Sequence, residues 1–196
     1  MKRKPRLLPV RIYGDEILRL KAREISALSP ELKEFIADLT HTMYLRDGVG
    51  LAAPQVGESL RVIVIDPDWF REGRQKKPLV MINPRSMDAE GETDTEEGCI
   101  SIPEVFAHVT RPSRVTLVYQ DVELAERRLE LEGYPAVIVQ HEIDHLHGKL
   151  FTDRLSLLKR RTAMREWEEE KLKYPKLLRV LPVGDLPPER DAASAD

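Results

Sequence analysis

The sequence predicts an α+β domain in which antiparallel β-sheets pack around a central helix, with a further helix near the C-terminus. Short β-branched or alternating segments recur between residues 60 and 132 with few helical segments between them, which is typical of antiparallel sheets. A helix with clear end signals follows at 135–148. The length of 196 residues suits one domain with a hydrophobic core. We expect this domain to cover residues 1–173 and residues 174–196 to form a mobile tail.

Charge and cysteine content exclude several classes of protein. The chain has 31 Lys and Arg against 34 Asp and Glu, a net charge of −3, whereas a dedicated nucleic-acid-binding domain is clearly basic. We therefore expect no DNA partner. No apolar run is long enough to span a membrane or to serve as a secretory signal. The single cysteine, Cys99, has no intramolecular disulfide partner, which fits a reducing, cytosolic compartment.

The first helix is predicted from its start signals and apolar spacing. Ser29 suits the N-cap and Pro30 the first helical position. Apolar residues then recur three and four apart, which gives one buried face; they are Leu32, Phe35, Ile36, Leu39 and Met43. We expect the helix to end at Asp47-Gly48.

The segment from Gly48 to Gly57 reads Gly-Val-Gly-Leu-Ala-Ala-Pro-Gln-Val-Gly. Its glycines and proline allow tight turns and a close approach of backbone to other groups. It lacks the Lys-Ser/Thr and the glycine spacing of phosphate-binding loops. Two interpretations stay open: a structural turn, or a loop beside a pocket in which Gln55 offers its amide.

Dense β-branched or alternating segments predict the strands, and Asn83-Pro84 closes the second of them. The alternation of Leu129 and Leu131 with glutamates indicates a strand with one buried face. Residues 66–78, rich in proline and charge, are expected to form an exposed loop. The predicted strands cover 60–65, 79–82, 105–110, 115–119 and 128–132.

The central helix carries the most informative motif, His-Glu-x-x-His at 141–145. Pro135 suits its first turn and Gly148 its end. Residues four apart lie only about 40° from each other on a helix, so His141 and His145 can bind a divalent metal from one face. Glu142 lies beside them and is free to transfer protons. The alternative is a core helix with two hydrogen-bonded histidines.

A catalytic metal usually takes three protein ligands and leaves one position for water. His147 lies about 240° around the helix from His141, and Phe151 stands where the extended zinc-protease pattern has its third histidine. Cys99 follows a glycine and as a thiolate would complete the site. The alternative is that Cys99 is a small buried apolar residue.

A strongly charged helix is predicted from about Ser156 to Lys173. Charge runs such as Lys159-Arg160-Arg161 more often mark a solvated face than a binding site. The segment after it contains four prolines and ends in small and acidic residues, which is typical of mobile chain ends.

Three segments together resemble the peptide deformylase family: Gly48–Gln55, Glu97–Ser101 and Gln140–Gly148. They occur in the family's order and at suitable separations, and a looser likeness extends from Val10 to Leu158. The resemblance implies a metal-dependent hydrolase that removes the N-formyl group from the N-terminal formyl-methionine of nascent polypeptides and releases formate.

The resemblance also implies the metal chemistry. Cys99, His141 and His145 would hold one divalent metal, Fe²⁺ in cells, with Zn²⁺, Ni²⁺ or Co²⁺ as alternatives in purified protein. Glu142 would be the general base and then the general acid.

Further roles follow from the same resemblance. Gln55 and the backbone N–H of Ile100 would stabilise the oxyanion, and Glu97 would support the site through an ion pair with Arg111. Many relatives have a basic residue where this chain has Val137, which leaves the shape of the methionine pocket open. By position, the substrate-binding residues are Val49, Gly50, Tyr134, Val137 and Ile138.

Two other functions are considered. A zinc endopeptidase would use the same His-Glu-x-x-His motif without needing Cys99. A non-catalytic metal-binding or ribosome-associated module would not need the intact Gln55 and Glu142. The expected partners are N-formylmethionyl nascent peptides and, as a further candidate, the ribosome near its exit tunnel. A bacterial cytoplasmic location is expected, and an organellar relative stays open.

Overall fold

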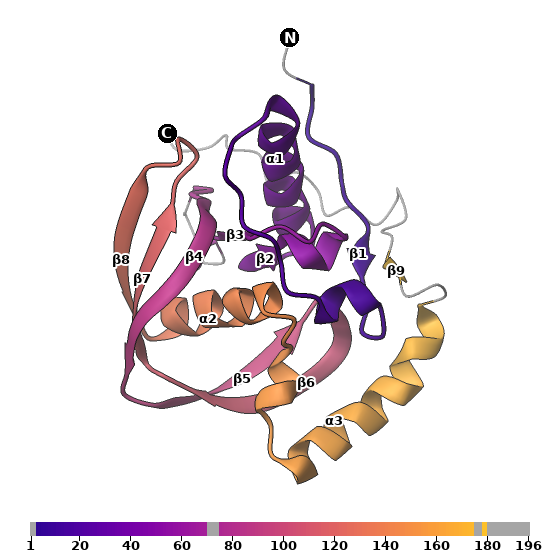
Figure 1. The fold of residues 1–196 in the computed structure, drawn as a ribbon. Helices are drawn as coiled ribbons and strands as arrows, with labels where there is room; N and C mark the ends of the chain where they lie inside the picture. Colours follow the sequence, from indigo (N-terminus) through magenta and orange to yellow (C-terminus); the bar gives the residue numbers. More distant parts are fainter. Residues whose placement is uncertain (1–2, 70–74, 175–177, 180–196) are drawn as a thin grey trace, which may run out of the picture.

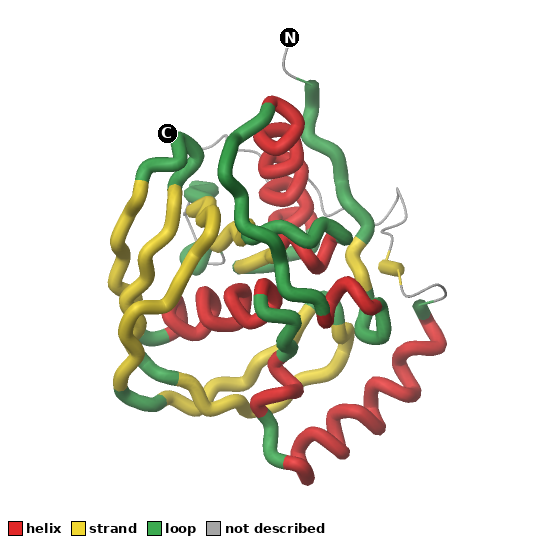
Figure 2. The backbone as a smooth tube through the Cα atoms, viewed as in Figure 1, coloured by secondary structure: helices red, strands yellow, loops and turns green. Residues whose placement is uncertain are grey.

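The computed structural model describes residues 3–69, 75–174 and 178–179. It has the predicted α+β architecture, with antiparallel sheets, a central helix and a C-terminal helix (Figures 1 and 2). The central helix, α2, lies between a curved five-stranded sheet and a long β-hairpin (Figure 1).

The strand pairs in the described part of the chain are all antiparallel. The five-stranded sheet has the order β2 (Gly50–Ala52), β3 (Val62–Ile65), β4 (Leu79–Glu90), β7 (Arg114–Gln120), β8 (Glu126–Glu132). The hairpin consists of β5 (Thr93–Cys99) and β6 (Ile102–Arg111). A short pair joins β1 (Val10–Arg11) to β9 (Leu178–Arg179).

The helices begin and end close to the predicted signals. They are α1 (Pro30–Leu45), α2 (Tyr134–Leu146) and α3 (Leu157–Glu170), with 3₁₀ turns at Glu16–Arg19, Ala53–Val56, Phe151–Arg154 and Lys171–Lys173. The Ser29 hydroxyl caps α1 by accepting from the N–H of Leu32 at 3.2 Å. After α2, Gly148 has a φ of +67°, a conformation that glycine adopts without the steric cost of a side chain.

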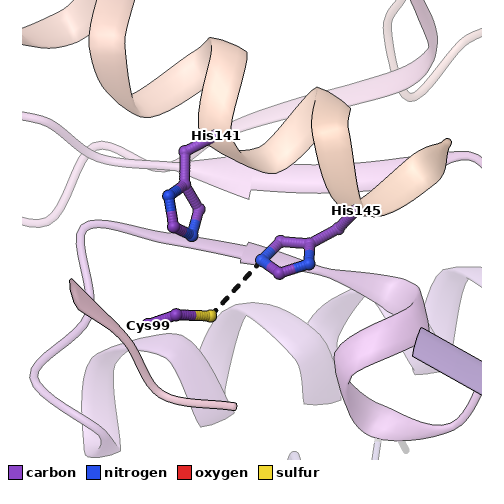
Figure 3. A group of neighbouring side chains, drawn as sticks. All are labelled: Cys99, His141 and His145. Atoms are coloured by element: carbon purple, nitrogen blue, oxygen red, sulfur yellow. Dashed lines mark hydrogen bonds between the residues drawn. The ribbon is translucent and has the colours of Figure 1, made fainter. Parts of the chain in front are cut away.

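Apolar packing fixes the depth of α2 beneath the sheet. Val139 and Leu146 of α2 are fully buried against Ile63, Met81 and Leu117 of the sheet. Burial of such a side chain stabilises the fold by roughly 1.5–3 kcal/mol. This contact holds one face of α2 and turns the face with His141 and His145 toward Cys99 at the end of β5 (Figure 3).

The strand predicted to close at Asn83-Pro84 continues instead to Glu90. The pairing with β7 shifts register between Ile82 and Arg85, and Asn83 has a φ of +50°. An irregularity of this kind tolerates a proline, which has no N–H to donate. The proline therefore marks a bulge inside β4 rather than its end.

Strand β5, which reads Thr-Asp-Thr-Glu-Glu-Gly-Cys, was not predicted. It has almost no apolar alternation, since its residues are exposed or half-buried, apart from the buried Glu97. Likewise, the glycine-rich segment 48–57 contains strand β2 and a 3₁₀ turn in addition to loops.

The C-terminal helix is present as α3, extended by a 3₁₀ turn to Lys173. Trp167 and Ala163 anchor it in a cluster that includes Val105 of β6. Of the predicted tail, Leu178–Arg179 pairs with Val10–Arg11; most of the remainder lies outside the described residues. None of the helices in the described part of the chain is long and apolar enough to cross a membrane.

Candidate active site

Figure 3 shows Cys99, His141 and His145 converging on one point. Their donor atoms all lie within 4.8 Å of one another, and Cys99 Sγ is 3.4 Å from His145 Nε2. Metal–sulfur and metal–nitrogen bonds of about 2.3 and 2.0–2.1 Å at a tetrahedral angle would separate these atoms by about 3.5 Å. The spacing and the sulfur–nitrogen donor set therefore fit a divalent metal such as zinc or iron.

Hydrogen bonding orients the His141 ring toward this point. Its Nδ1 lies 2.8 Å from the Oε2 of Glu97, so Nδ1–H donates to the carboxylate and Nε2 faces Cys99. Carboxylate–histidine pairs orient metal-binding imidazoles in this way. The Nδ1 of His145 is buried without a partner.

Burial and neighbouring charges set the pKa values of the two histidines. Burial and the nearby His141 charge lower the pKa of His145 well below its ordinary value, which keeps it neutral. Burial also lowers the pKa of His141, but hydrogen bonds to Cys99 and Glu97 raise it well above its usual range. A cation bound by Nε2 would displace this proton, since metal ligands must be deprotonated.

Glu97 and Arg111 form a buried ion pair behind His141. The guanidinium donates to both carboxylate oxygens, with Nη2 to Oε2 at 2.9 Å and a closer contact from Nε to Oε1. Burial raises the pKa of Glu97, but the hydrogen bonds from His141 and Arg111 lower it below its ordinary value. Glu97 therefore stays ionised and keeps the proton of His141 on Nδ1.

A cleft of about 360 Å³ opens onto this centre. Its walls come from the glycine-rich segment, the β5–β6 hairpin and α2. Two of the candidate residues, His145 and Arg111, lie behind the cleft wall. The sequence-predicted residues that line it are Val49, Gly50, Gln55, Glu97, Cys99, Ile100, Tyr134, Val137, Ile138, His141 and Glu142.

Glu142 is buried at the floor of the cleft, with 5 % of its surface exposed. Its Oε2 has no hydrogen-bond partner. Burial raises its pKa to about 7, against the opposing charges of His141 and Arg111. A carboxyl group with such a pKa can both accept and donate a proton near neutral pH.

The Gln55 amide is oriented by the turn that carries it. Its Oε1 accepts from the N–H of Ala52 at 2.9 Å. The Nε2 group therefore points the other way, 3.4 Å from Cys99 Sγ and 3.3 Å from Ser101 Oγ. This places an N–H donor at the candidate metal centre, beside Ile100, which follows Cys99 in the chain.

Three neighbouring residues had no role in the sequence analysis. Asp144 is buried and accepts a hydrogen bond from Arg111 at 2.9 Å. The feature of the sequence that could have indicated a role for Asp144 is its acidic side chain within a largely apolar helix. Ser101 is fully buried beside Gln55. Phe106 lines the cleft and lies over Gly98, where an added Cβ would be 2.5 Å from its ring. Its alignment with Gly98 depends on the hairpin register, which the sequence does not predict.

Fold and site together define an α+β metallohydrolase in which a His-Glu-x-x-His helix and a cysteine meet at one cleft. The family model for polypeptide deformylase matches residues 7–161. The chain belongs to this family.

Curated relatives and solved structures agree with this assignment. The chain is 44 % identical over 160 residues to a peptide deformylase of Pelodictyon phaeoclathratiforme, covering 82 % of this chain and 85 % of the relative. It superimposes on a peptide deformylase from Legionella pneumophila with a TM-score of 0.79, at 39 % identity over 87 % of this chain and 99 % of that one. A peptide deformylase from Synechococcus elongatus, solved with actinonin, gives a TM-score of 0.76 at 40 % identity over 85 % of this chain and 89 % of that one.

The chain is thus an enzyme, a metal-dependent hydrolase acting on the N-formyl group of nascent polypeptides. Neither the endopeptidase nor the non-catalytic module is favoured by these similarities.

Proposed function

We propose that the cleft of this chain removes the formyl group from N-terminal formyl-methionine with the residues that the sequence analysis selected. The observation that carries the proposal is the convergence of a Cys-His-His donor set with a buried, unpaired carboxyl group at Glu142 and an oriented amide at Gln55. Each of these groups supplies one of the functions that hydrolysis of an amide requires.

Cys99, His141 and His145 would hold one divalent metal, with Fe²⁺ as the ion used in cells and Zn²⁺, Ni²⁺ or Co²⁺ as substitutes in purified protein. When bound, the cation would lower the pKa of a water molecule and polarise a carbonyl oxygen. The chain contributes the orientation of the ligands: Glu97 fixes the His141 ring and Arg111 fixes Glu97.

Glu142 is the proton carrier. As a carboxylate it removes a proton from the water that attacks the formyl carbon. It then delivers this proton to the amide nitrogen, which leaves as the free amine of methionine while the formyl group leaves as formate. Without that proton the nitrogen would have to leave as an unstable anion. Such acid–base assistance contributes about 10²–10⁴-fold to the rate.

Gln55 Nε2 and the backbone N–H of Ile100 are the proposed oxyanion donors. During attack, negative charge develops on the formyl oxygen, and fixed donors stabilise it without having to reorganise. Removing one such donor costs about 3 kcal/mol in the barrier. The hydrogen bond from Ala52 to Oε1 supports this role, because it directs Nε2 of Gln55 inward.

The methionine side chain would bind the apolar wall of the cleft. Val137 and Ile138 of α2 are nearly fully buried there. Val49, Gly50 and Tyr134 line the cleft as well, and Tyr134, which is 52 % exposed, could contact the peptide beyond the methionine. An apolar wall with a few polar groups is typical of such binding sites.

The proposed setting is the bacterial cytoplasm, where nascent formylated chains leave the ribosome. Bacterial relatives support this setting. Docking on the ribosome would be a role for α3, whose run Lys159-Arg160-Arg161 is basic. Salt-dependent binding of the purified protein to ribosomes, lost when these three residues are neutralised, would test it.

One assay tests the proposed reaction. Metal-loaded protein is incubated with formyl-Met-Ala-Ser and, separately, with an unformylated peptide of the same composition. We expect one formate and one new amine for each formylated peptide and no cleavage of the second. Release of internal amines without formate would indicate an endopeptidase, and no product from either peptide would contradict catalysis.

A further inference from the structure

A chain of charged contacts joins the protein surface to the candidate metal centre. Arg154 donates from Nε and Nη2 to the two oxygens of Asp144, at 2.7 and 2.6 Å. Asp144 also accepts from Nη1 of Arg111 at 2.9 Å. Arg111 holds both oxygens of Glu97, and Glu97 accepts from Nδ1 of His141 at 2.8 Å.

Burial makes the inner contacts sensitive to one another. The side chains of Arg111, Glu97 and Asp144 are 0, 5 and 6 % exposed, whereas that of Arg154 is 39 % exposed. Charges interact more strongly away from water. The four groups alternate in sign and sum to zero. Removal of Arg154 would leave one buried carboxylate, Asp144, in excess.

We propose that Arg154 is a positioning residue for the metal ligand His141, although it lies outside the cleft. Without Arg154, Asp144 attracts the guanidinium of Arg111 more strongly. Arg111 then holds Glu97 less firmly, and the His141 ring loses part of its orientation. This inference rests on the proposed role of His141 as a metal ligand.

Arg160 provides a matched control for Arg154. It is an arginine of similar side-chain exposure, 41 % against 39 %, and it pairs with a neighbouring carboxylate, Asp153, at 3.2 Å. Asp153 pairs with Arg19 as well and is not part of the chain from Arg154 to His141. Loss of Arg160 therefore removes a similarly exposed arginine and its ion pair, to a carboxylate that is 22 % rather than 6 % exposed, without touching the chain that leads to His141.

The experiment measures Ni²⁺ affinity of the full chain by competition with a chelator, for wild type, Arg154→Ala, Arg154→Lys and Arg160→Ala. Loss of a residue that directly orients a ligand typically costs 10–100-fold in metal affinity. Because Arg154 acts on His141 through three intermediates, we expect a loss of about 3- to 10-fold for Arg154→Ala. Arg160→Ala should bind like wild type. The Ni²⁺ affinity of Arg154→Lys should lie between those of wild type and Arg154→Ala, since an ammonium group keeps the charge but not the bidentate contact.

The Co²⁺ absorption spectrum supplies a readout that general destabilisation would not move. We expect Arg154→Ala to shift the ligand-field bands, and Arg160→Ala to leave them in place. Ni²⁺ affinity of Arg154→Ala within twofold of wild type, or an equal loss in Arg160→Ala, would overturn the inference. Wild-type protein that binds no Ni²⁺ would contradict the metal site itself, so the two failures are distinguishable.

Discussion

The backbone of Gly50 lies so close to Glu142 that a Cβ atom at position 50 would be 2.5 Å from Oε1 and 2.9 Å from Cγ. Real Cβ atoms do not approach other atoms so closely. The missing side chain of Gly50 therefore leaves the space in which the Glu142 carboxyl group stands, at the edge of the five-stranded sheet.

We predict that Gly50→Ala displaces Glu142 without removing the metal. The added methyl group forces the carboxyl group to move, and a misplacement of about 1 Å can cost about 10²-fold in rate. Activity on formyl-Met-Ala-Ser should fall by about that factor while Ni²⁺ content stays at one per chain. A variant with wild-type kcat would show that this contact does not position the base.

Glu142→Gln is expected to bind metal as wild type does and to lose about 10²–10⁴-fold in kcat, because the amide cannot accept the proton of the attacking water. Glu96→Gln is the matched control. Glu96 lines the same cleft but is exposed, so the activity of Glu96→Gln should stay near that of wild type. Near-normal turnover of Glu142→Gln at full metal occupancy would rule out the assigned role.

The elements that could be predicted from the sequence are those with a local signal. Ser29 and Pro30 mark the start of α1, and the i, i+4 spacing of His141 and His145 puts both on one face of α2. Such signals depend only on residues close in the sequence, so they can be recognised without knowledge of the fold.

What could not be predicted depends on distant pairing. The strand β5 has no apolar pattern, since Glu97 alone among its residues is buried, and its place in the fold is set by pairing with β6. The burial of Asp144 against Arg111, 33 residues away, depends on how α2 packs on the hairpin. The resemblance to a family connected Cys99 with the two histidines, whereas local residue patterns left its role open.

Asp38 of α1 gives a prediction for stability against pH. Burial raises its pKa, but hydrogen bonds from the Arg3 side chain and the Arg6 backbone lower it below the ordinary 3.8. A carboxyl group with a depressed pKa in the folded state stabilises the fold above its unfolded pKa, and this contribution is lost as the pH falls through its folded pKa. Asp38 therefore contributes fully at pH 7, and its contribution is lost progressively as the pH falls below 3.8.

We expect Asp38→Asn to lower the free energy of unfolding by about 1–3 kcal/mol at pH 7, since hydrogen bonds to a charged group are lost. The difference in the free energy of unfolding between Asp38→Asn and wild type should shrink as the pH falls below 3.8. Urea unfolding at several pH values measures both. Glu34→Gln serves as control: Glu34 also pairs with Arg3 but its side chain is 55 % exposed, so a change within about 0.5 kcal/mol is expected. A constant difference at all pH values would contradict the pKa argument.

A chain ending at Tyr174 should deformylate formyl-Met-Ala-Ser as fast as the full chain, because the described residues that line the cleft all precede it. Tyr174 itself is kept, since its ring stacks on Trp167 at 6.2 Å. Loss of the two-residue pairing of Leu178–Arg179 with β1 should affect stability rather than rate. A tenfold fall in kcat/KM with an unchanged circular dichroism spectrum would show that the predicted tail takes part in the reaction.

The variant Cys99→Ala distinguishes between two roles of Cys99, a metal ligand and a small residue that only contributes to packing. As a ligand, Cys99 is a thiolate held by the cation, and metal uptake releases its proton. Its removal leaves two histidines, so metal affinity and activity should fall together. Were Cys99 only part of the packing, the substitution would cost about 1 kcal/mol of stability and leave metal content unchanged.

The comparison is made on wild type and Cys99→Ala loaded side by side, with metal per chain and formate release measured on the same samples. Proton release on Ni²⁺ addition, followed with a pH indicator in weak buffer, should be smaller in the variant because the thiol proton is missing. A thiolate beside ferrous iron is also open to oxidation, so the iron form of wild type should lose activity in air while the nickel form persists. Equal metal content and equal activity in the two proteins would remove Cys99 from the site.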